Sequence, residues 1–222
     1  MLILLGTLSL PQHKHKTISR ESVVKSLCIP SNYYLKRNFS ENILKKYDVG
    51  ECTTHGKEMY NRAVVPIYDI DHKRMIGCSG RSIDESLKPK WRHSTGFKAE
   101  ENLYNYWYAK DFIKECGVVI LVESPGNVWR LEEAGIHNSV ALFGASLGDK
   151  QKMLLDISGA MTIITIMDND EAGKKAALQI NKKCQRIYNM KNIEINYADI
   201  AEMSVDQINK EIKPLIERYN EC

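Results

Sequence analysis

Apolar runs alternate with amphipathic stretches through the second half of the chain. Residues 117–122 form a continuous apolar run, which is typical of a strand buried on both faces of a sheet. An apolar stripe at helical spacing runs from Ala172 to Ile187 and predicts a helix with one buried face. The same reasoning predicts strands over 117–122, 139–143, 161–167 and 193–197, and helices over 127–134, 149–157, 171–188 and 205–219. Because strand and helix alternate four times with short links, the predicted fold class is α/β, with a mostly parallel sheet covered by helices.

The first half is less regular and predicts a smaller α+β region. Ser40 precedes an apolar pair and suits the N-cap of a helix. Residues 62–70 and 75–79 flank a polar segment, so they predict a β-hairpin. A further helix is expected over 100–114, with an inward face formed by Leu103, Trp107 and either Ala109 or Phe112.

The chain begins with ten largely apolar residues, and positive charge follows them. A membrane span needs roughly 20 apolar residues, and a signal peptide carries its positive charge before the apolar run. We therefore expect residues 1–10 to be a buried strand or packed arm, and we expect no membrane association. Together the patterns divide the chain into a basic α+β region (1–116), an α/β domain (117–203) and a C-terminal helix (204–222).

Carboxylates follow three of the four predicted strands. Because the carboxyl ends of parallel strands meet at one edge of a sheet, we expect these side chains to lie close together. Crowded carboxylates repel one another unless a cation joins them, and hard oxygen ligands suit Mg²⁺ or Mn²⁺. For each acid alone a helix N-cap is the alternative, but caps would not select three strand ends jointly. The predicted ligands are Glu123, Asp168, Asp170, Asp199 and Glu202.

Charge is unevenly distributed, although the net charge is only +3. Residues 1–116 hold 19 basic and 13 acidic residues, whereas residues 117–222 hold 12 and 15. Residues 81–98 carry five basic residues, with Trp91 and Phe97 among them. Bases stack on rings and phosphates pair with cations, so this stretch suits single-stranded nucleic acid or nucleotides. The alternative is a solvated basic loop with two anchoring aromatic residues.

Composition and cysteine spacing indicate a globular protein and exclude some kinds of structural site. Hydrophobic residues make up 43% of the 222 residues and charged residues 27%, which is globular rather than disordered. Six cysteines occur at wide, irregular spacings without a Cys-x-x-Cys pair. This spacing argues against a structural zinc site and against a disulfide framework, and it fits a reducing cytosol.

Motifs in both halves resemble known families. Those of the second half are similar to the Toprim domain: Leu121-Val122-Glu123, Gly135-Ile136, Gly144 and Met167-Asp168-Asn169-Asp170-Glu171-Ala172-Gly173. Those of the first half resemble the basic N-terminal subdomain of DnaG-type primases: Arg37-Asn38-Phe39-Ser40, residues 61–69, Gly77-x-x-Gly80-Arg81, Lys88-Pro89-Lys90-Trp91 and Phe97-Lys98. The resemblance covers about residues 31–210. It is strongest to the primases of phages and mobile elements.

The resemblance implies a DNA primase catalytic core that synthesises short RNA primers on single-stranded DNA by metal-dependent nucleotidyl transfer. It implies Mg²⁺ or Mn²⁺ as cofactor and no zinc. The partners it implies are a single-stranded DNA template, ribonucleoside triphosphates, a replicative helicase and a separate zinc-binding module, in the bacterial cytoplasm or an infected host cell. By the family pattern the catalytic acids are Glu123, Asp168 and Asp170, and the residues that bind nucleic acid or nucleotide are Arg62, Arg81, Lys90, Arg92 and Lys98.

One position departs from the family pattern, which has an acid where this chain has Asn127. We expect Asn127 either to face the acidic site together with Glu123 or to cap the following helix. Two other functions remain open on the sequence: a Toprim nuclease or RNA-processing hydrolase, in which the same acids activate water, and a non-catalytic nucleic-acid-binding module. The basic first half favours the primase over the hydrolase.

Overall fold

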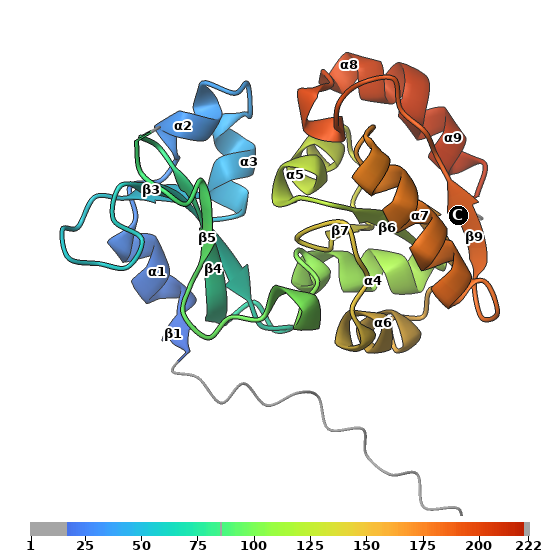
Figure 1. The fold of residues 1–222 in the computed structure, drawn as a ribbon, viewed down its shortest axis with the longest axis horizontal. Coiled ribbons are helices and arrows are strands. Elements are labelled where there is room, and N and C mark those ends of the chain that lie inside the picture. The colour runs from blue at the N-terminus through green and yellow to red at the C-terminus, as the bar shows by residue number, and fades with distance from the viewer. Residues whose placement is uncertain (1–16, 85, 220–222) are drawn as a thin grey trace, which may run out of the picture.

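Two β-sheets, one antiparallel and one parallel, organise the computed structural model, which describes residues 17–84 and 86–219 (Figure 1). The arm expected at residues 1–10 lies outside the described residues. Within the described residues, none of the helices is long and apolar enough to cross a lipid bilayer. The α/β fold class with a parallel second sheet is confirmed.

The first half folds around the antiparallel sheet. Its strand order is β1-β4-β3-β2, and β5 pairs with β4. Strands β3 and β4 form the predicted hairpin, with Arg62 opposite Ser82 and Ile67 opposite Gly77. Every residue of β3 is buried. The strands are β1 (Ile18–Ser19), β2 (Gly50–Cys52), β3 (Arg62–Tyr68), β4 (Arg74–Ser82) and β5 (Trp91–His93).

The second half folds around the parallel sheet, whose order is β7-β6-β8-β9. Its strands are β6 (Val118–Val122), β7 (Ser139–Ala141), β8 (Thr162–Thr165) and β9 (Asn189–Asn192). Successive residues of β6 point to opposite faces and enter different cores, since Val118, Ile120 and Val122 belong to one apolar cluster and Val119 and Leu121 to the other. The run 117–122 is therefore buried on both faces, as its composition predicts.

Helices cover both faces of the parallel sheet. Three of them pack on the Val119 side: α4 (Tyr106–Cys116), α6 (Asp149–Asp156) and α7 (Glu171–Cys184). The opposite face carries α5 (Pro125–Glu133) and a helix from Val205 to Glu217, which consists of α8 (Val205–Gln207), the π-helical turn η3 (Ile208–Ile212) and α9 (Lys213–Glu217). The remaining helices are α1 (Arg20–Ser26), α2 (Asn32–Leu35) and α3 (Glu41–Lys46), with 3₁₀ turns η1 (Ala99–Glu101) and η2 (Ile200–Glu202).

Several predicted boundaries are wrong, for identifiable reasons. The last strand is residues 189–192 rather than 193–197, because its polar residues pair through the backbone while Ile193 and Ile195 are buried beyond the ladder. Helix α7 ends at Cys184, which leaves Ile187 68% exposed. On α4 the inward residue is Ala109, and Phe112 is exposed.

The two halves share one apolar core. A single cluster of buried residues contains Ile67 of β3, Leu44 of α3, Trp129 of α5 and Ile120 of β6. Helix α4, which the predicted boundary at residue 116 assigns to the first half, packs against the second sheet through residues such as Ile113. The three-part division therefore stays a prediction.

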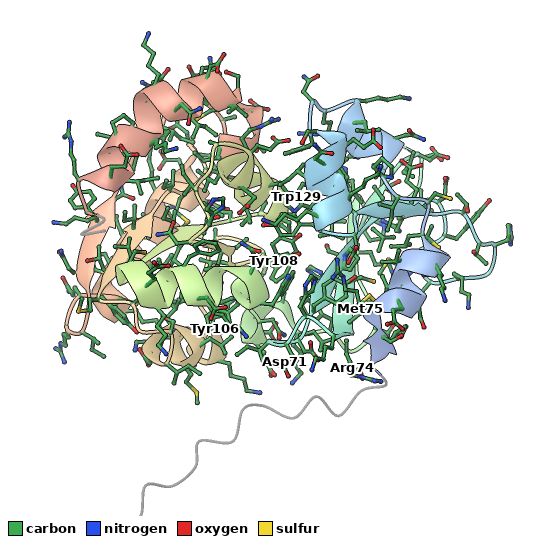
Figure 2. The ribbon with its side chains drawn as sticks, turned by 180° about the vertical axis from the view of Figure 1, so that it is seen from behind. Asp71, Arg74, Met75, Tyr106, Tyr108 and Trp129 are labelled. Atoms are coloured by element: carbon green, nitrogen blue, oxygen red, sulfur yellow. The ribbon has the colours of Figure 1, made fainter. Side chains whose placement is uncertain are left out.

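Trp129 is the largest fully buried side chain, and it lies between the two halves (Figure 2). Its indole Nε1 donates to the hydroxyl oxygen of Tyr104 at 2.8 Å. The rings of Tyr34 and Phe39 from the first half meet it edge-on, with centroids 5.0 and 5.3 Å away. Such pairs contribute beyond the area they bury, so Trp129 is a main contact that holds the halves together.

We expect Trp129→Phe to lower the free energy of unfolding by about 2–3 kcal/mol, because it leaves the Tyr104 hydroxyl without its donor and opens a cavity. Chemical denaturation measures the change. The matched control is Trp91→Phe, since Trp91 is 44% exposed and surface substitutions usually change stability by less than about 0.5 kcal/mol. Equal effects of the two substitutions would contradict this account of the interface.

Candidate functional site: a carboxylate pair at the parallel sheet

Glu123 and Asp168 meet at the carboxyl ends of the two central strands. Glu123 directly follows β6, and Asp168 follows β8 by three residues. The backbone N–H of Asp168 donates to Oε1 of Glu123 at 3.1 Å. Both side chains are half-buried. The structure thus brings together the two acids that the sequence placed on neighbouring strand ends, at the edge where ligands bind in such sheets.

Gly173 lets the first turn of α7 come close to this pair. A Cβ at position 173 would lie 2.0 Å from the carbonyl oxygen of Asp168 and 3.0 Å from Oε1 of Glu123. Both distances are too short for a methyl group, so only glycine fits without moving the helix. The glycine of the Asp-x-Asp-x-x-Gly segment is therefore required by packing against the acids.

The environment of the pair disfavours negative charge. Burial is the largest cause that raises the pKa of Asp168, and together with the neighbouring Glu123 carboxylate it brings that pKa to about 7. Burial also raises the pKa of Glu123, and the charges of Asp170 and Asp199 add to this effect. Carboxylates with raised pKa values are common in functional sites. The pair Glu123 and Asp168 is therefore a candidate for one.

Asn127 bridges Asp168 to the loop that follows the last strand. Its Nδ2 donates to Oδ1 of Asp168 at 3.1 Å, and its Oδ1 accepts from the backbone N–H of Ala201 at 3.1 Å. The side chain is fully buried. It is not the helix cap, because Ser124 Oγ accepts from the backbone N–H of Asn127 and caps α5. Asn127 faces the acidic site and orients Asp168.

Of the three other predicted acids, Asp170 and Asp199 act electrostatically on the pair and also cap local structure. Asp170 caps α7 through a 2.7 Å bond from the N–H of Gly173, and Asp199 caps η2 through a 2.9 Å bond from the N–H of Glu202. Glu202 and Asp170 are exposed. Among residues 17–84 and 86–219, no group of three or more His, Cys, Asp or Glu side chains converges closely enough to hold a metal ion by itself.

The predicted basic residues divide into buried and exposed ones. Arg62 is only 2% exposed, and its Nη1 donates to the carbonyl oxygens of Gly80 and Pro89. The guanidinium thus holds the loop after β4, and its contact with nucleic acid stays a prediction. Lys90, Arg92 and Lys98 are exposed.

Arg81 lies between two rings. Its guanidinium carbon is 5.8 Å from the ring centroid of Tyr33 and 5.4 Å from that of Trp91. Its Nε is buried and has no hydrogen-bond partner. Trp91 is exposed, so this cationic stack is open to solvent on one side. Sequence reasoning missed Tyr33 because this residue comes from α2, far from Arg81 in the sequence. The antiparallel pairing of β4 and β5 brings Arg81 beside Trp91.

Arg130 is a second residue that sequence reasoning missed. It is 6% exposed, and its guanidinium lies 4.7 Å above the ring of Phe39. It donates to Glu133 at 2.7 Å and to the carbonyl oxygen of Ala201 at 3.4 Å. The sequence pattern does not predict the contacts of Arg130, because Phe39 and Ala201 come from distant segments. Arg130 joins the first half to the loop that Asn127 also holds.

Comparison with known proteins agrees with this arrangement. Residues 117–192 match the Toprim domain family. The chain is 41% identical over 118 residues to the DNA primase of Aquifex aeolicus, an alignment that covers 52% of this chain and 23% of that protein. The chain thus spans about a quarter of the length of this curated relative.

Solved structures match nearly the whole chain. The crystal structure of the zinc-binding and RNA polymerase domains of the Aquifex aeolicus primase superposes with a TM-score of 0.73 at 26% identity, over 90% of this chain and 58% of that one. A DnaG primase catalytic domain bound to single-stranded DNA superposes with a TM-score of 0.65 at 19% identity, over 90% of this chain and 78% of that one. The second likeness concerns the fold alone.

The family match covers the parallel sheet with its two acids, and the structural match extends over the antiparallel sheet in front of it. Residues 117–192 are therefore similar to the Toprim domain, and the chain as a whole resembles the catalytic core of DnaG-type DNA primases.

Proposed function

We propose that this chain is the catalytic core of a DNA primase, which joins ribonucleotides into short primers on a single-stranded DNA template. The observation that carries the proposal is the half-buried pair Glu123 and Asp168 at the carboxyl ends of β6 and β8. The likeness to a DnaG catalytic domain bound to single-stranded DNA supports the choice of template. The 41% identity to a DNA primase supports the choice of reaction.

A divalent cation fits the chemistry of this pair. The two carboxylates supply hard oxygen ligands, and each has a raised pKa, because nearby acids and burial oppose its charge. A Mg²⁺ or Mn²⁺ ion would be held by Glu123 and Asp168, and the neighbouring carboxylates of Asp170 and Asp199 would add to the negative potential at the ion. Glu202 stays a predicted ligand. In a nucleotidyl transferase such an ion activates the attacking hydroxyl and steadies the leaving pyrophosphate.

The protein groups around the pair then have distinct tasks. Asn127 fixes the orientation of Asp168 through its amide, and Gly173 permits the approach of α7. The exposed cations Lys90, Arg92 and Lys98 are suited to neutralise phosphates of template or nucleotide. Arg81 and Trp91 present a charge and a ring to a base or sugar-phosphate.

The wider assignments belong to the same proposal. Ribonucleoside triphosphates are the substrates, and a replicative helicase and a separate zinc-binding module are the expected partners. The expected site of action is the cytoplasm of a bacterium or of a cell that carries a phage or mobile element. A Toprim nuclease is the competing function, and the assay below distinguishes it, because a nuclease would shorten the template and make no new strand.

We expect Glu123→Gln to reduce primer synthesis by at least about a hundredfold, because it removes one of the two carboxylates that hold the cation. The assay mixes the purified chain with single-stranded DNA, labelled ribonucleotides and Mg²⁺ or Mn²⁺, and resolves products on a gel. The control Asp111→Asn changes an exposed acid on α4 and should retain full activity. New oligonucleotides made equally well by Glu123→Gln would remove the site assignment. Template cleavage without synthesis would favour the nuclease.

Metal-free stability should depend on pH through Asp168. Its pKa is about 7 in the folded state against 3.8 ordinarily, so the folded state binds more protons than the unfolded state between pH 4 and 7. The free energy of unfolding should therefore fall as pH rises through this window. Asp168→Asn should flatten this decline and raise stability at pH 7.5 without metal.

Denaturant titrations at several pH values, with and without Mg²⁺ or Mn²⁺, measure both effects. The cation should raise the free energy of unfolding of the wild type at pH 7.5 and leave that of Asp168→Asn nearly unchanged, since ligands stabilise the state that binds them. Asp111→Asn is again the matched control. A wild type and an Asp168→Asn variant with parallel pH profiles and equal responses to metal would remove Asp168 from the metal assignment.

The exposed lysines should contribute by pairing with phosphates. Lys90→Ala and Lys98→Ala should each weaken binding of single-stranded DNA and lower the salt slope of the affinity by about one unit for each phosphate that is no longer neutralised. Fluorescence anisotropy at several salt concentrations measures the slope. The control Lys210→Ala removes an exposed lysine from the C-terminal helix. A slope that is identical in the wild type and all three variants would make residues 88–98 a solvated loop.

A further inference from the structure

Phe143 has an unfavourable backbone conformation just beyond β7. Its φ is +63°, in the left-handed region, where a bulky residue is rare and strained. Asparagine or glycine would occupy this position with less strain. Strain of this kind persists where the surrounding structure or the function requires the side chain. The strain at Phe143 therefore indicates that its phenyl ring makes contacts that asparagine or glycine could not make.

The ring of Phe143 contacts both halves of the molecule. Its centroid lies 5.6 Å from that of Phe97 and 5.9 Å from that of His93, both in edge-on geometry. On the side of the parallel sheet it meets Tyr104 at 6.0 Å, also edge-on. Phe97 and His93 belong to the basic stretch 81–98, so Phe143 joins this stretch to the second half.

Phe97 is itself held tightly on the antiparallel sheet. A Cβ on Gly77 of β4 would lie 2.3 Å from the Phe97 ring, so the ring rests directly on the strand backbone. Ser94, between the two aromatic residues, is fixed by a bond from its backbone N–H to the carbonyl oxygen of Cys78 at 2.8 Å. The segment 93–97 therefore moves with β4, and Phe143 is seated against a well-anchored surface.

The backbone on either side of Phe143 is tied to the strand that presents Glu123. The N–H of Leu142 donates to the carbonyl oxygen of Val122 at 3.0 Å, and the N–H of Gly144 donates to that of Glu123 at 3.1 Å. Phe143 thus sits between two backbone bonds that end at Val122 and Glu123. A displacement of its ring is passed to the backbone of the acidic site within one residue.

We propose that Phe143 is a positioning residue, whose strained backbone aims its ring at Phe97 and His93 and so fixes the basic stretch 81–98 relative to Glu123. The contacts themselves do not depend on the reaction. The effect on primer synthesis rests on the proposed function, because a misplacement of about 1 Å between substrate-holding and reacting groups costs up to about a hundredfold in rate.

The test compares Phe143→Asn with Phe143→Tyr. Asparagine accepts the left-handed backbone and lacks the ring, whereas tyrosine keeps the ring and the strain. Phe143→Asn should speed amide hydrogen exchange over residues 91–98 and lower kcat of primer synthesis about tenfold or more, at a temperature where both variants are fully folded. The Kd for single-stranded DNA should change less than about twofold, because the exposed lysines remain. Phe143→Tyr should restore exchange and kcat to wild-type values.

The control Phe112→Asn removes an exposed phenylalanine of α4 and should leave exchange over residues 91–98 unchanged. The proposal is overturned if Phe143→Asn and Phe143→Tyr have the same kcat, which would make the ring ordinary packing. It is also overturned if exchange over 91–98 stays at the wild-type rate. If the wild type makes no primers, the proposed function fails, and the exchange measurements still decide whether Phe143 positions the segment.

Discussion

The buried contact of Trp129 with Tyr104 and with the rings of the first half is the interaction on which the rest of the structure depends. Trp129 lies in the middle of α5, and both ends of that helix do further tasks. Its first turn begins at the Ser124 cap and supplies Asn127 to the acidic site. Its last turn supplies Glu132 and Glu133, which accept bonds from Lys46 and from the backbone N–H of Ser40 at the two ends of α3. One helix therefore sets the orientation of Asp168 and the position of the first half together.

The surroundings of Glu123 and Asp168 disfavour the negative charge of both carboxylates. Burial and mutual repulsion raise the pKa of Glu123 and of Asp168, and a buried amide rather than a cation is the side chain that contacts Asp168. An arginine there would have neutralised the pair and made it an ordinary ion pair. The amide orients Asp168 but leaves its charge uncompensated, which is what the proposed cation site requires. In the first half, Lys90 and Arg92 are exposed.

The features that depend on local sequence patterns were predicted correctly. The run 117–122 identified β6, because a strand buried on both faces has no polar position, and the strand ends then located Glu123 and Asp168. Sequence reasoning failed where long-range contacts decide. The burial of Arg62 depends on carbonyl groups of Gly80 and Pro89, and the strand 189–192 depends on backbone pairing with β8. The role of Asn127 depends on Ala201, which is 74 residues away. None of these partners is visible as a spacing.

Glu132 and Glu133 at the end of α5 also bear on whether the parallel-sheet half can be separated from the first half. Glu132 and Glu133 occupy the negative end of the helix dipole, where carboxylates are unfavourable without partners. Lys46 and the backbone of Ser40, both from the first half, are among those partners. An excised unit that began at residue 117 would lose them and would uncover Trp129 at its surface. The second half therefore depends on the first for its stability. A recombination event that moves it into another protein must also transfer α2 and α3, or must replace both the ring contacts of Trp129 and the positive partner of Glu132.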